Sequence, residues 1–473
     1  MTSVIFICIL LNWMFGVDLD YFLSKSVTLA IVFFLALIEK SPLADAKKLL
    51  VLTHRATRIL ITSCVIFIPF IFIQDDHLFT LILTIQSIPF ALVIGNMLTL
   101  PFESIIQKKY IQQAKNTLNN VNPIIIGITG SFGKTSMKHI LGHILQKYQP
   151  TLFTPGSVNT PMGICSIIQK KLSPDHKFFI VEMGAYHIGS IAKICSLTPP
   201  NFGAVTSIGP CHLERFGSME NIASAKSELL SAVEQNKHPI GFSFPTSISK
   251  LTPFKTFFNS KLMMPTIECI EKKQTVHGIE LKIKENEQQI AIKAPIFGLH
   301  QADNIVLAIT VARKLGTPME LIKSALLSLK QVPARLEVKD APQNITWIND
   351  GFNANPEGFK EGINLLKQFG DHKHGRKILV TPGVIELGDQ HDEIHAQLAK
   401  HAMSNVDVVI VVAHHRIKTF LQTCELLQKN DQIIIKALSF SDAHRWLNGH
   451  VKTNDTILIA NDLPDILETR PNI

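Results

Sequence analysis

The stretch GITGSFGKTS, residues 127–136, decides the fold class. It follows the apolar run Ile124–Ile126 and precedes a helical pattern, so a strand, a glycine-rich turn and a helix come in succession. Such a turn directs backbone N–H groups and a helix N-terminus at one anion. The usual phosphate-binding loop has a glycine six positions before its lysine, where this chain has Ile128, and Gly130 is an additional glycine. The stretch therefore predicts a phosphate-binding loop with an unusual glycine pattern.

This loop predicts an ATP site with bound Mg²⁺. Lys134 would reach the terminal phosphates and Thr135 would bind Mg²⁺. The remaining loop residues expected to bind ATP are Gly130, Ser131, Gly133 and Ser136. The alternative is a glycine-rich turn that binds nothing, but Gly-Lys-Thr directly after a strand argues against it. The next apolar strand, in KFFIVEMGAYHIGSI, ends at Glu182, where a second Mg²⁺ ligand belongs, although a lone glutamate there is more often a capping or surface residue.

Beyond this loop, short apolar runs alternate with helical stretches, which is typical of a parallel sheet with crossover helices. Strands are expected at 124–126, 178–181 and 202–206, and helices at 136–146 and 221–233. A second alternating block begins near Pro333, with strands near residues 346, 378, 408, 433 and 457. The fold class is therefore α/β, with a P-loop central domain built on a mostly parallel sheet and a C-terminal Rossmann-like α/β domain.

The first hundred residues carry most of the apolar excess of a chain that is 46% hydrophobic and 18% charged. Segments 1–16, 22–38, 59–73 and 78–100 are nearly free of charge, and the last can span a bilayer core of about 30 Å. Basic residues lie between the second and third segments and after the fourth. By the positive-inside rule, we expect about four transmembrane helices in the inner (cytoplasmic) membrane, with the lipid bilayer as a partner and all later residues in the cytoplasm.

Composition leaves few other function classes open. A cleaved signal peptide is the alternative for segment 1–16, but this segment lacks a basic start and a small-residue cleavage site. The net charge of +8 would suit an anionic partner, but basic residues that flank membrane segments account for it, and no nucleic-acid partner is expected. The 7 cysteines are scattered without paired-ligand spacing, which indicates reduced thiols and no structural zinc.

The segment AVTSIGPCHLERFGSMENIASAKSELL, residues 204–230, contains a third element of the site. His212 follows an apolar strand and Lys226 lies inside a helix. Taken singly, His212 is a polar loop residue and Lys226 pairs with a glutamate on a solvated helix face. In this order after the P-loop and Glu182, the set resembles the Mur ligase family, the ATP-dependent amide-forming ligases of peptidoglycan synthesis. Its pattern is most similar to the members that add D-alanyl-D-alanine.

The resemblance covers roughly residues 123–465, and the family's own phosphate loop also lacks the early glycine. It implies catalytic roles for Lys134, Glu182, His212 and Lys226, with Lys226 carbamylated. It implies metal binding by Thr135, Glu182, His212 and Lys226. The segments GLHQADN, PARLE and DGFNANP imply nucleotide contacts, to adenine by Asn304, to phosphate by Arg335, and to ribose and phosphates by Asp350 and Asn353. IELG with His395 completes the likeness.

The sequence departs from the family's pattern in the parts of the chain that would bind the two substrates. The membrane region is expected in place of the family's uridine-nucleotide-binding domain, and Tyr186 and Gln301 stand where asparagines are usual. The implied domains are a membrane region at 1–105, a connector at 106–122, a central ATP-binding domain at 123–333 and a C-terminal domain at 334–473. The implied reaction uses ATP and Mg²⁺ to convert a carboxylate, such as that of a muramyl peptide, into an acyl phosphate. An amino acid or dipeptide amine then attacks it.

Three alternatives stay open beside this hypothesis. The same ligase could act on a polyglutamate-type or amino-acid-type acceptor rather than on a muramyl peptide. A membrane-associated P-loop ATPase would also combine apolar helices with this loop, but it should show a paired Asp-Glu strand end or a second signature motif, and neither is evident. A non-catalytic scaffold that keeps the ligase fold is the third alternative, and the joint presence of Lys134, Glu182, His212 and Lys226 argues against it.

Overall fold

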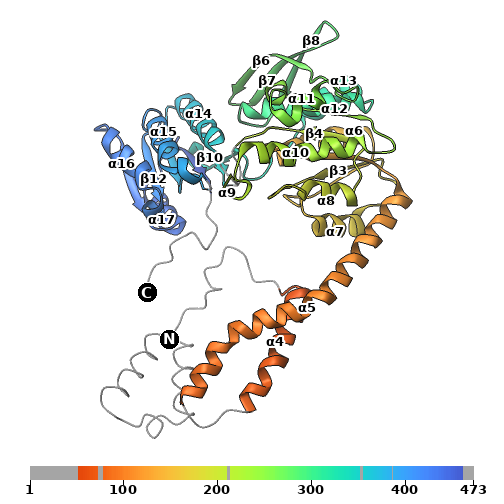
Figure 1. Ribbon diagram of the computed structural model, residues 1–473. Helices are drawn as coiled ribbons and strands as arrows, with labels where there is room; N and C mark the ends of the chain where they lie inside the picture. The colour runs from red at the N-terminus through yellow and green to blue at the C-terminus, as the bar shows by residue number, and fades with distance from the viewer. Residues whose placement is uncertain (1–51, 73–77, 210–212, 352–354, 386, 462–473) are drawn as a thin grey trace, which may run out of the picture. The chain divides into compact units, whose positions relative to one another are not determined.

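The computed structural model describes residues 52–72, 78–209, 213–351, 355–385 and 387–461 (Figure 1). The chain forms two compact units, Met1–Tyr110 and Ile111–Ile473. In the first unit, α4 (His54–Phe72) and the first part of α5 (Leu78–Val121) are in contact. The Nε of Arg58 donates to Oε1 of Glu103 at 2.7 Å, and a side chain at Gly95 would collide with Ser63. Small residues therefore let these two helices approach closely.

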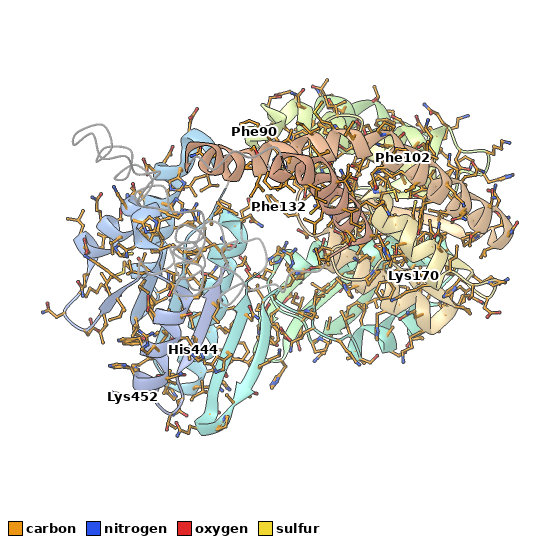
Figure 2. All side chains as sticks on the ribbon, turned by 90° about the horizontal axis from the view of Figure 1, so that it is seen from below. Phe90, Phe102, Phe132, Lys170, His444 and Lys452 are labelled. Atoms are coloured by element: carbon orange, nitrogen blue, oxygen red, sulfur yellow. The ribbon has the colours of Figure 1, made fainter. Side chains whose placement is uncertain are left out.

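The prediction of a multi-pass membrane region is wrong. Among the described residues, one helical segment, Gln86–Val121, is long and apolar enough to cross a bilayer, and a helix in a protein core passes the same test. The segment exposes Phe90 and Phe102 (Figure 2), but its polar end buries Ala114 and Leu118 in a hydrophobic cluster of the second unit. Length and composition are weak evidence for a membrane span because a core helix or a signal sequence passes the same test. The predicted spans at 1–16 and 22–38 lie outside the described residues.

The second unit begins with a parallel sheet of five strands in the order β2-β3-β1-β4-β5. Its elements are β1 (Ile124–Thr129), α6 (Lys134–Tyr148), β2 (Thr151–Phe153), α7 (Pro161–Lys171), β3 (Phe178–Glu182), α8 (Ser190–Leu197), β4 (Phe202–Val205), α9 (Leu213–Phe216), α10 (Met219–Glu234) and β5 (Gly241–Ser243). The strands predicted at 124–126, 178–181 and 202–206 are confirmed, as are the helices at 136–146 and 221–233.

The register of this sheet assembles the site. Ile128 of β1 pairs with Glu182 of β3, and Thr129 pairs with Val205 of β4. Because parallel strands end at the same edge of a sheet, the segments that follow β1, β3 and β4 meet there. Segments far apart in the sequence are thereby brought to one place.

The chain then adds α11 (Thr252–Phe258) and an antiparallel sheet, β6 (Glu268–Thr275), β7 (Gly278–Glu285) and β8 (Gln288–Ala294), which the sequence analysis did not predict. Alternating apolar residues such as Ile279, Leu281 and Ile283 were the missed signal, since all three are buried in the main core. That core also receives α12 (His300–Lys314) and α13 (Met319–Leu327), which both pack against α6. Helix α12 is thereby held beside the helix that follows the phosphate loop.

The C-terminal sheet has the order β13-β12-β11-β14-β10-β9, and only the β9–β10 pair is antiparallel. Its elements are β9 (Glu337–Ala341), β10 (Ile345–Asp350), α14 (Pro356–Lys373), β11 (Lys377–Thr381), α15 (His391–Met403), β12 (Val408–Val412), α16 (Lys418–Leu427), β13 (Ile433–Ala437), α17 (Phe440–His450) and β14 (Thr456–Ala460). The strands predicted near 346, 378, 408, 433 and 457 are confirmed, and the edge strand β9 was missed. The α/β fold with two such domains is therefore confirmed.

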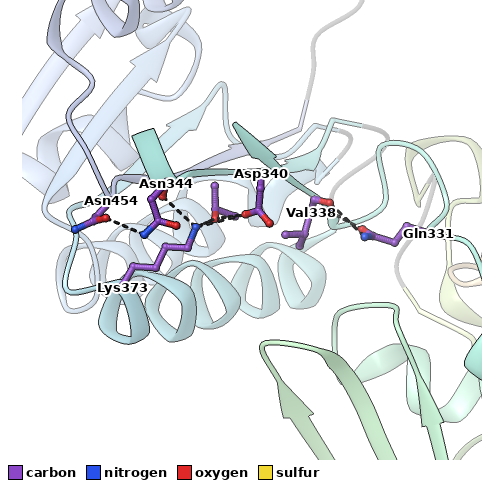
Figure 3. Close-up of polar contacts among 7 residues, drawn as sticks. Gln331, Val338, Asp340, Asn344, Lys373 and Asn454 are labelled. Carbon is purple, nitrogen blue, oxygen red and sulfur yellow. Dashed lines mark hydrogen bonds and ion pairs between the residues drawn. The ribbon is translucent and has the colours of Figure 1, made fainter. Parts of the chain in front are cut away.

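Polar side chains hold the edge strand β9 in place (Figure 3). The Nζ of Lys373 on α14 donates to the carbonyl of Asn344 at 3.0 Å and reaches Asp340. The side-chain amide of Gln331 pairs with both backbone groups of Val338, at 2.6 and 3.2 Å. A side chain therefore takes the place of a neighbouring strand, which shields an otherwise unpaired edge.

Candidate active site

The loop between β1 and α6 requires its glycines. Gly130 has φ +146° and Gly133 has φ +81°, both in the region that disfavours other residues. A Cβ at Gly130 would collide with Thr206, and one at Gly133 would come within 2.6 Å of the Oδ1 of Asn304. The intervening Phe132 (Figure 2) packs against Gly209, where there is no side chain. Both positions therefore require glycine, because a side chain there would meet Thr206 or Asn304.

Lys134 closes this loop. Its Nζ donates to the carbonyls of Gly130 at 2.7 Å and of Ser131 at 2.9 Å. The backbone N–H of Ser131 is itself held by the carbonyl of Ser207 at 2.7 Å. The ammonium group thus sits over the loop at the N-terminus of α6, where the helix dipole and N–H groups favour an anion. The contact of Lys134 with the terminal phosphates remains a prediction.

Thr135 and Glu182, predicted as metal ligands, are in contact. The hydroxyl of Thr135 donates to Oε2 of Glu182 at 3.1 Å, and the Glu182 side chain is 1% exposed. Asn159 donates from Nδ2 to Oε1 of Glu182 at 3.3 Å. A hydroxyl and a carboxylate oxygen side by side are hard oxygen ligands of the kind that Mg²⁺ prefers.

A lysine that the sequence analysis missed lies against the same carboxylate. Lys138 is fully buried, and its Nζ donates to Oε2 of Glu182 at 2.8 Å and to the carbonyl of Gly156. Burial lowers the pKa of Lys138, and the charge and hydrogen bond of Glu182 oppose that shift. Its position one helical turn after Lys134 and Thr135 was the signal, because residues three and four apart share a helix face.

Lys226 lies at the same cavity. It is 4% exposed, and its Nζ is 5.8 Å from the centre of the Phe216 ring. The alternative of a solvated helix face is therefore excluded for this residue. Its predicted partner His212 lies outside the described residues, so the carbamylated two-metal arrangement remains a prediction.

Helix α12 contributes three neighbouring polar residues. Gln301 donates from Nε2 to the hydroxyl of Ser136 at 3.1 Å, and Asn304 donates to Oε1 of Gln301 at 2.9 Å. His300, which was not predicted, lines the cavity, and the surrounding protein and the charge of Arg335 lower its pKa. The adenine contact expected of Asn304 remains a prediction.

Arg335 reaches the cavity from the segment between the two sheets. Its neighbours Ala334 and Leu336 have positive φ angles of 55° and 50°, which non-glycine residues rarely adopt. The carboxylate of Asp350 accepts the Leu336 N–H at 3.2 Å and so fixes this unusual turn. Burial raises the pKa of Asp350 to about 6, and Arg335 and the Leu336 N–H act against the shift.

Many of these residues line one cavity of about 270 Å³, whereas Lys138 and the predicted Gly130 and Asn304 are not at its wall. The predicted residues at its wall are Ser131, Gly133, Lys134, Thr135, Ser136, Glu182, Lys226, Arg335 and Asp350. Residues at the wall that were missed include Ser157, Asn159, His300 and Asn355. Asn355 had a readable signal, because Asn-Pro at 355–356 is an N-cap followed by proline at N1, and its side chain accepts the Gly358 N–H at 2.9 Å. The predicted Asn353 lies outside the described residues.

His395 is buried and supports the cavity wall through hydrogen bonds. It is fully buried, its Nε2 accepts the N–H of Val384 at 3.1 Å, and its Nδ1 faces the carbonyl of His391 at 2.7 Å. Burial lowers its pKa to about 4. Both bonds require a neutral ring with the proton on Nδ1, so His395 holds the segment 383–384, whose Val384 lines the cavity.

The residues present fit a nucleotide with its metal ion. Two glycines hold the loop where a Cβ would collide with Thr206 or Asn304, and Lys134 lies at the N-terminus of α6. The Thr135 hydroxyl and the Glu182 carboxylate form an oxygen donor set beside that loop. The fold and the site together define a P-loop protein of two α/β domains with the phosphate loop and Arg335 at one cavity.

Comparison with known families agrees with this class. Residues 128–312 match the Mur ligase middle domain, and residues 334–461 match the Mur ligase glutamate ligase domain. Together the two matches cover more than half of the 473 residues, and the chain belongs to the Mur ligase family.

Its relatives include D-alanyl-D-alanine-adding enzymes. The UDP-N-acetylmuramoyl-tripeptide--D-alanyl-D-alanine ligase of Escherichia coli (strain K12) is 28% identical over 305 residues, 62% of this chain and 66% of that protein. The enzyme of the same name from Bacillus subtilis (strain 168) is 27% identical over 60% of this chain and 62% of its own length. The chain thus spans less than two thirds of each relative.

A solved structure shows the same fold. The MurF ligase of Thermotoga maritima in complex with ADP has a TM-score of 0.64 at 24% identity, covering 75% of this chain and 80% of that one. Neither the matched domains nor the names of the relatives support a bilayer partner or an inner-membrane location, and those two predictions are withdrawn.

Proposed function

We propose that this chain is an ATP-dependent ligase that forms an amide bond in a peptidoglycan precursor. The proposed reaction joins D-alanyl-D-alanine to the carboxylate of a UDP-muramoyl-tripeptide, as the names of the relatives indicate for those proteins. The observation that carries the proposal is the contact of Thr135 with Glu182 beside the phosphate loop, in a cavity that also receives Arg335 and Asp350.

The chemical task explains the residues at this cavity. A carboxylate is a poor target for an amine, so its oxygen is first made a good leaving group by transfer of the γ-phosphoryl group of ATP, and the amine then displaces phosphate. Phosphoryl transfer depends mainly on positioning and charge neutralisation. Lys134 would neutralise the terminal phosphates from the loop side, and Arg335 would do so from the opposite domain.

Thr135 and Glu182 are the proposed ligands of a magnesium ion, which would add positive charge at the transferring group. His212 and carbamylated Lys226 are proposed as ligands of a second ion. Asp350, Asn304 and Asn353 are proposed to contact the nucleoside and phosphates. The proposed catalytic domains are residues 123–333 and 334–473, after a connector at 106–122.

The proposal is tested with the purified full chain, ATP, MgCl₂, UDP-muramoyl-tripeptide and D-alanyl-D-alanine. We expect phosphate release that depends on both substrates, together with a product whose mass equals their sum less one water. Phosphate release that does not depend on either the UDP-muramoyl-tripeptide or D-alanyl-D-alanine would instead indicate a P-loop ATPase.

The same assay should also include a polyglutamate-type acceptor. The reason is that Tyr186 lies at the cavity wall, where the family usually has asparagine. Tyr186 is 46% exposed, and the guanidinium carbon of Arg215 lies 4.9 Å from its ring centre. The Tyr186 ring and the Arg215 guanidinium offer an aromatic face and a positive charge to an acceptor, whereas the asparagine that the family usually has offers a small amide. Ligation of a polyglutamate-type acceptor, with no product from the muramoyl-tripeptide, would favour the alternative ligase.

A further inference from the structure

Lys138 occupies a site that is costly for a charged group. The side chain on α6 is fully buried. Burying a lysine is unfavourable unless its charge is paired and its hydrogen bonds are made. Here the Nζ donates to the Glu182 carboxylate at 2.8 Å and to the carbonyl of Gly156.

Stability alone is a weak reason for this ion pair. Replacing a buried ion pair by apolar residues of similar volume is often neutral or stabilising. The neighbouring buried residues Met137, Ile140 and Leu141 show that apolar side chains fill this helix readily. A charged pair at this position is better explained by what it does to Glu182.

The contacts of Glu182 leave capacity for one more ligand. An ionised carboxylate has about four acceptor sites. In the described residues three side-chain donors occupy it: Lys138 and Thr135 on Oε2, and Asn159 on Oε1. The carboxylate also lines the cavity. Its orientation is therefore set from three sides while it still faces the space where the phosphates are expected.

Lys138 also joins two parts of the cavity wall. Its second acceptor, Gly156, begins a segment that places Ser157 and Asn159 at the cavity. The same segment is tied to the end of β3, because the Gly184 N–H donates to the carbonyl of Asn159 at 3.2 Å. One ammonium group thus bridges the metal-side carboxylate and the 156–159 segment.

We propose that Lys138 is a positioning residue that holds Glu182 in the orientation required for metal binding and fastens the 156–159 segment to it. This inference rests on the proposed function, because it assumes a divalent ion bound with the nucleotide. Residues that orient a metal ligand typically change metal affinity by about 10- to 100-fold when they are removed.

The test compares Lys138→Met with the parent chain and with Lys147→Met, which removes an exposed lysine from the same helix. Mn²⁺ binding in the presence of ADP is measured by the loss of the free-ion electron paramagnetic resonance signal, and melting temperature is measured separately. We expect Lys138→Met to bind Mn²⁺ about 10- to 100-fold more weakly. Lys147→Met should bind it within about twofold of the parent.

A lower melting temperature with Mn²⁺ affinity within twofold of the parent would overturn the inference and leave Lys138 a stability residue only. If Lys138→Met is unfolded in buffer, the comparison is made for all three proteins in trimethylamine N-oxide, which favours the folded state. A parent that binds ADP but no Mn²⁺ would overturn the metal-dependent ligase proposal and the inference with it. Normal binding by the parent and Lys138→Met together would overturn the inference alone.

Discussion

The hydroxyl of Thr135 donates to the carboxylate of Glu182 at 3.1 Å, although the two residues are 47 positions apart. One follows the strand β1 and the other ends the strand β3, and Ile128 pairs directly with Glu182 in the sheet. Parallel pairing thus brings the Thr135 hydroxyl, in the first turn of α6, to the carboxylate at the end of the adjacent strand β3. This relationship makes the site testable residue by residue.

The first prediction concerns Thr135. Thr135→Val keeps the side-chain shape but removes the hydroxyl, so Glu182 loses a donor and the proposed metal loses a ligand. We expect amide formation to fall by about 10²- to 10³-fold, with a larger requirement for Mg²⁺. The control is Thr135→Ser, which keeps the hydroxyl and should retain most of the activity. Equal activity of the valine and serine variants would exclude a metal-binding role for Thr135.

Lys134 is expected to matter for turnover more than for folding. Lys134→Ala removes two hydrogen bonds to loop carbonyls, each worth about 0.5–1.5 kcal/mol at this half-buried place. It also removes the positive charge at the phosphate loop, and we expect ATP-dependent ligation to fall by at least about 10²-fold. Urea unfolding and a phosphate-release assay on the same preparation separate the two effects. Parent-like ligation by this variant would mean that the loop does not bind the transferring phosphate.

Lys226 is the residue at which a carbamate is expected. Lys226→Ala should abolish amide formation, and added acetate should restore part of the rate because it returns a negative charge to the space that the lysine leaves at the cavity. Lys226→Arg should stay inactive, since arginine keeps its charge and does not take up CO₂. Burial of Lys226 beside Phe216 makes its space enclosed enough to hold a small anion. Full activity of either variant without acetate would contradict the two-metal mechanism.

Asp350 is expected to make stability fall as the pH rises. Its folded pKa of about 6 lies above the ordinary 3.8, so its contribution is fully favourable below pH 3.8 and is lost as the pH rises through 6. Raising the pKa from 3.8 to about 6 corresponds to about 3 kcal/mol of free energy. Asp350→Asn keeps an acceptor for the Leu336 N–H and removes this titration. The difference in unfolding free energy between parent and variant should change by this amount between pH 4 and 7; a constant difference would contradict the assignment.

His395 should act in the opposite direction. Its folded pKa of about 4 lies below the ordinary 6.5, so the stability that it contributes above pH 6.5 is lost as the pH falls toward 4. The shift corresponds to about 3 kcal/mol. His395→Leu removes this titration and leaves the Val384 N–H without its acceptor. We expect the variant to be less stable at pH 7 by about 1–3 kcal/mol, and the deficit should shrink by pH 4. A deficit that is independent of pH would show that the ring does not stay neutral.

The sequence by itself determined the fold class and the phosphate loop. The alternation of apolar runs with helical stretches located the strands around residues 124, 178, 202, 346, 378, 408, 433 and 457, because period and length are local properties. The glycines and lysine of the loop are adjacent in the chain, so their chemistry is readable without a structure. The antiparallel strands β6–β8 also carry a local signal, the alternation of apolar and polar residues, but they were not predicted.

Only the tertiary structure decided which polar residues meet. Lys138 and Asn159 are ordinary residues in the sequence, and they become partners of Glu182 because α6 packs beside β3 and because the segment after β2 returns to its end. Arg335 enters the same cavity from a turn with positive φ angles, and Asp350 at the end of β10 accepts the Leu336 N–H of that turn. The multi-pass membrane prediction was wrong because hydropathy reports only that a side chain avoids water, and a long apolar helix passes the same test in more than one setting.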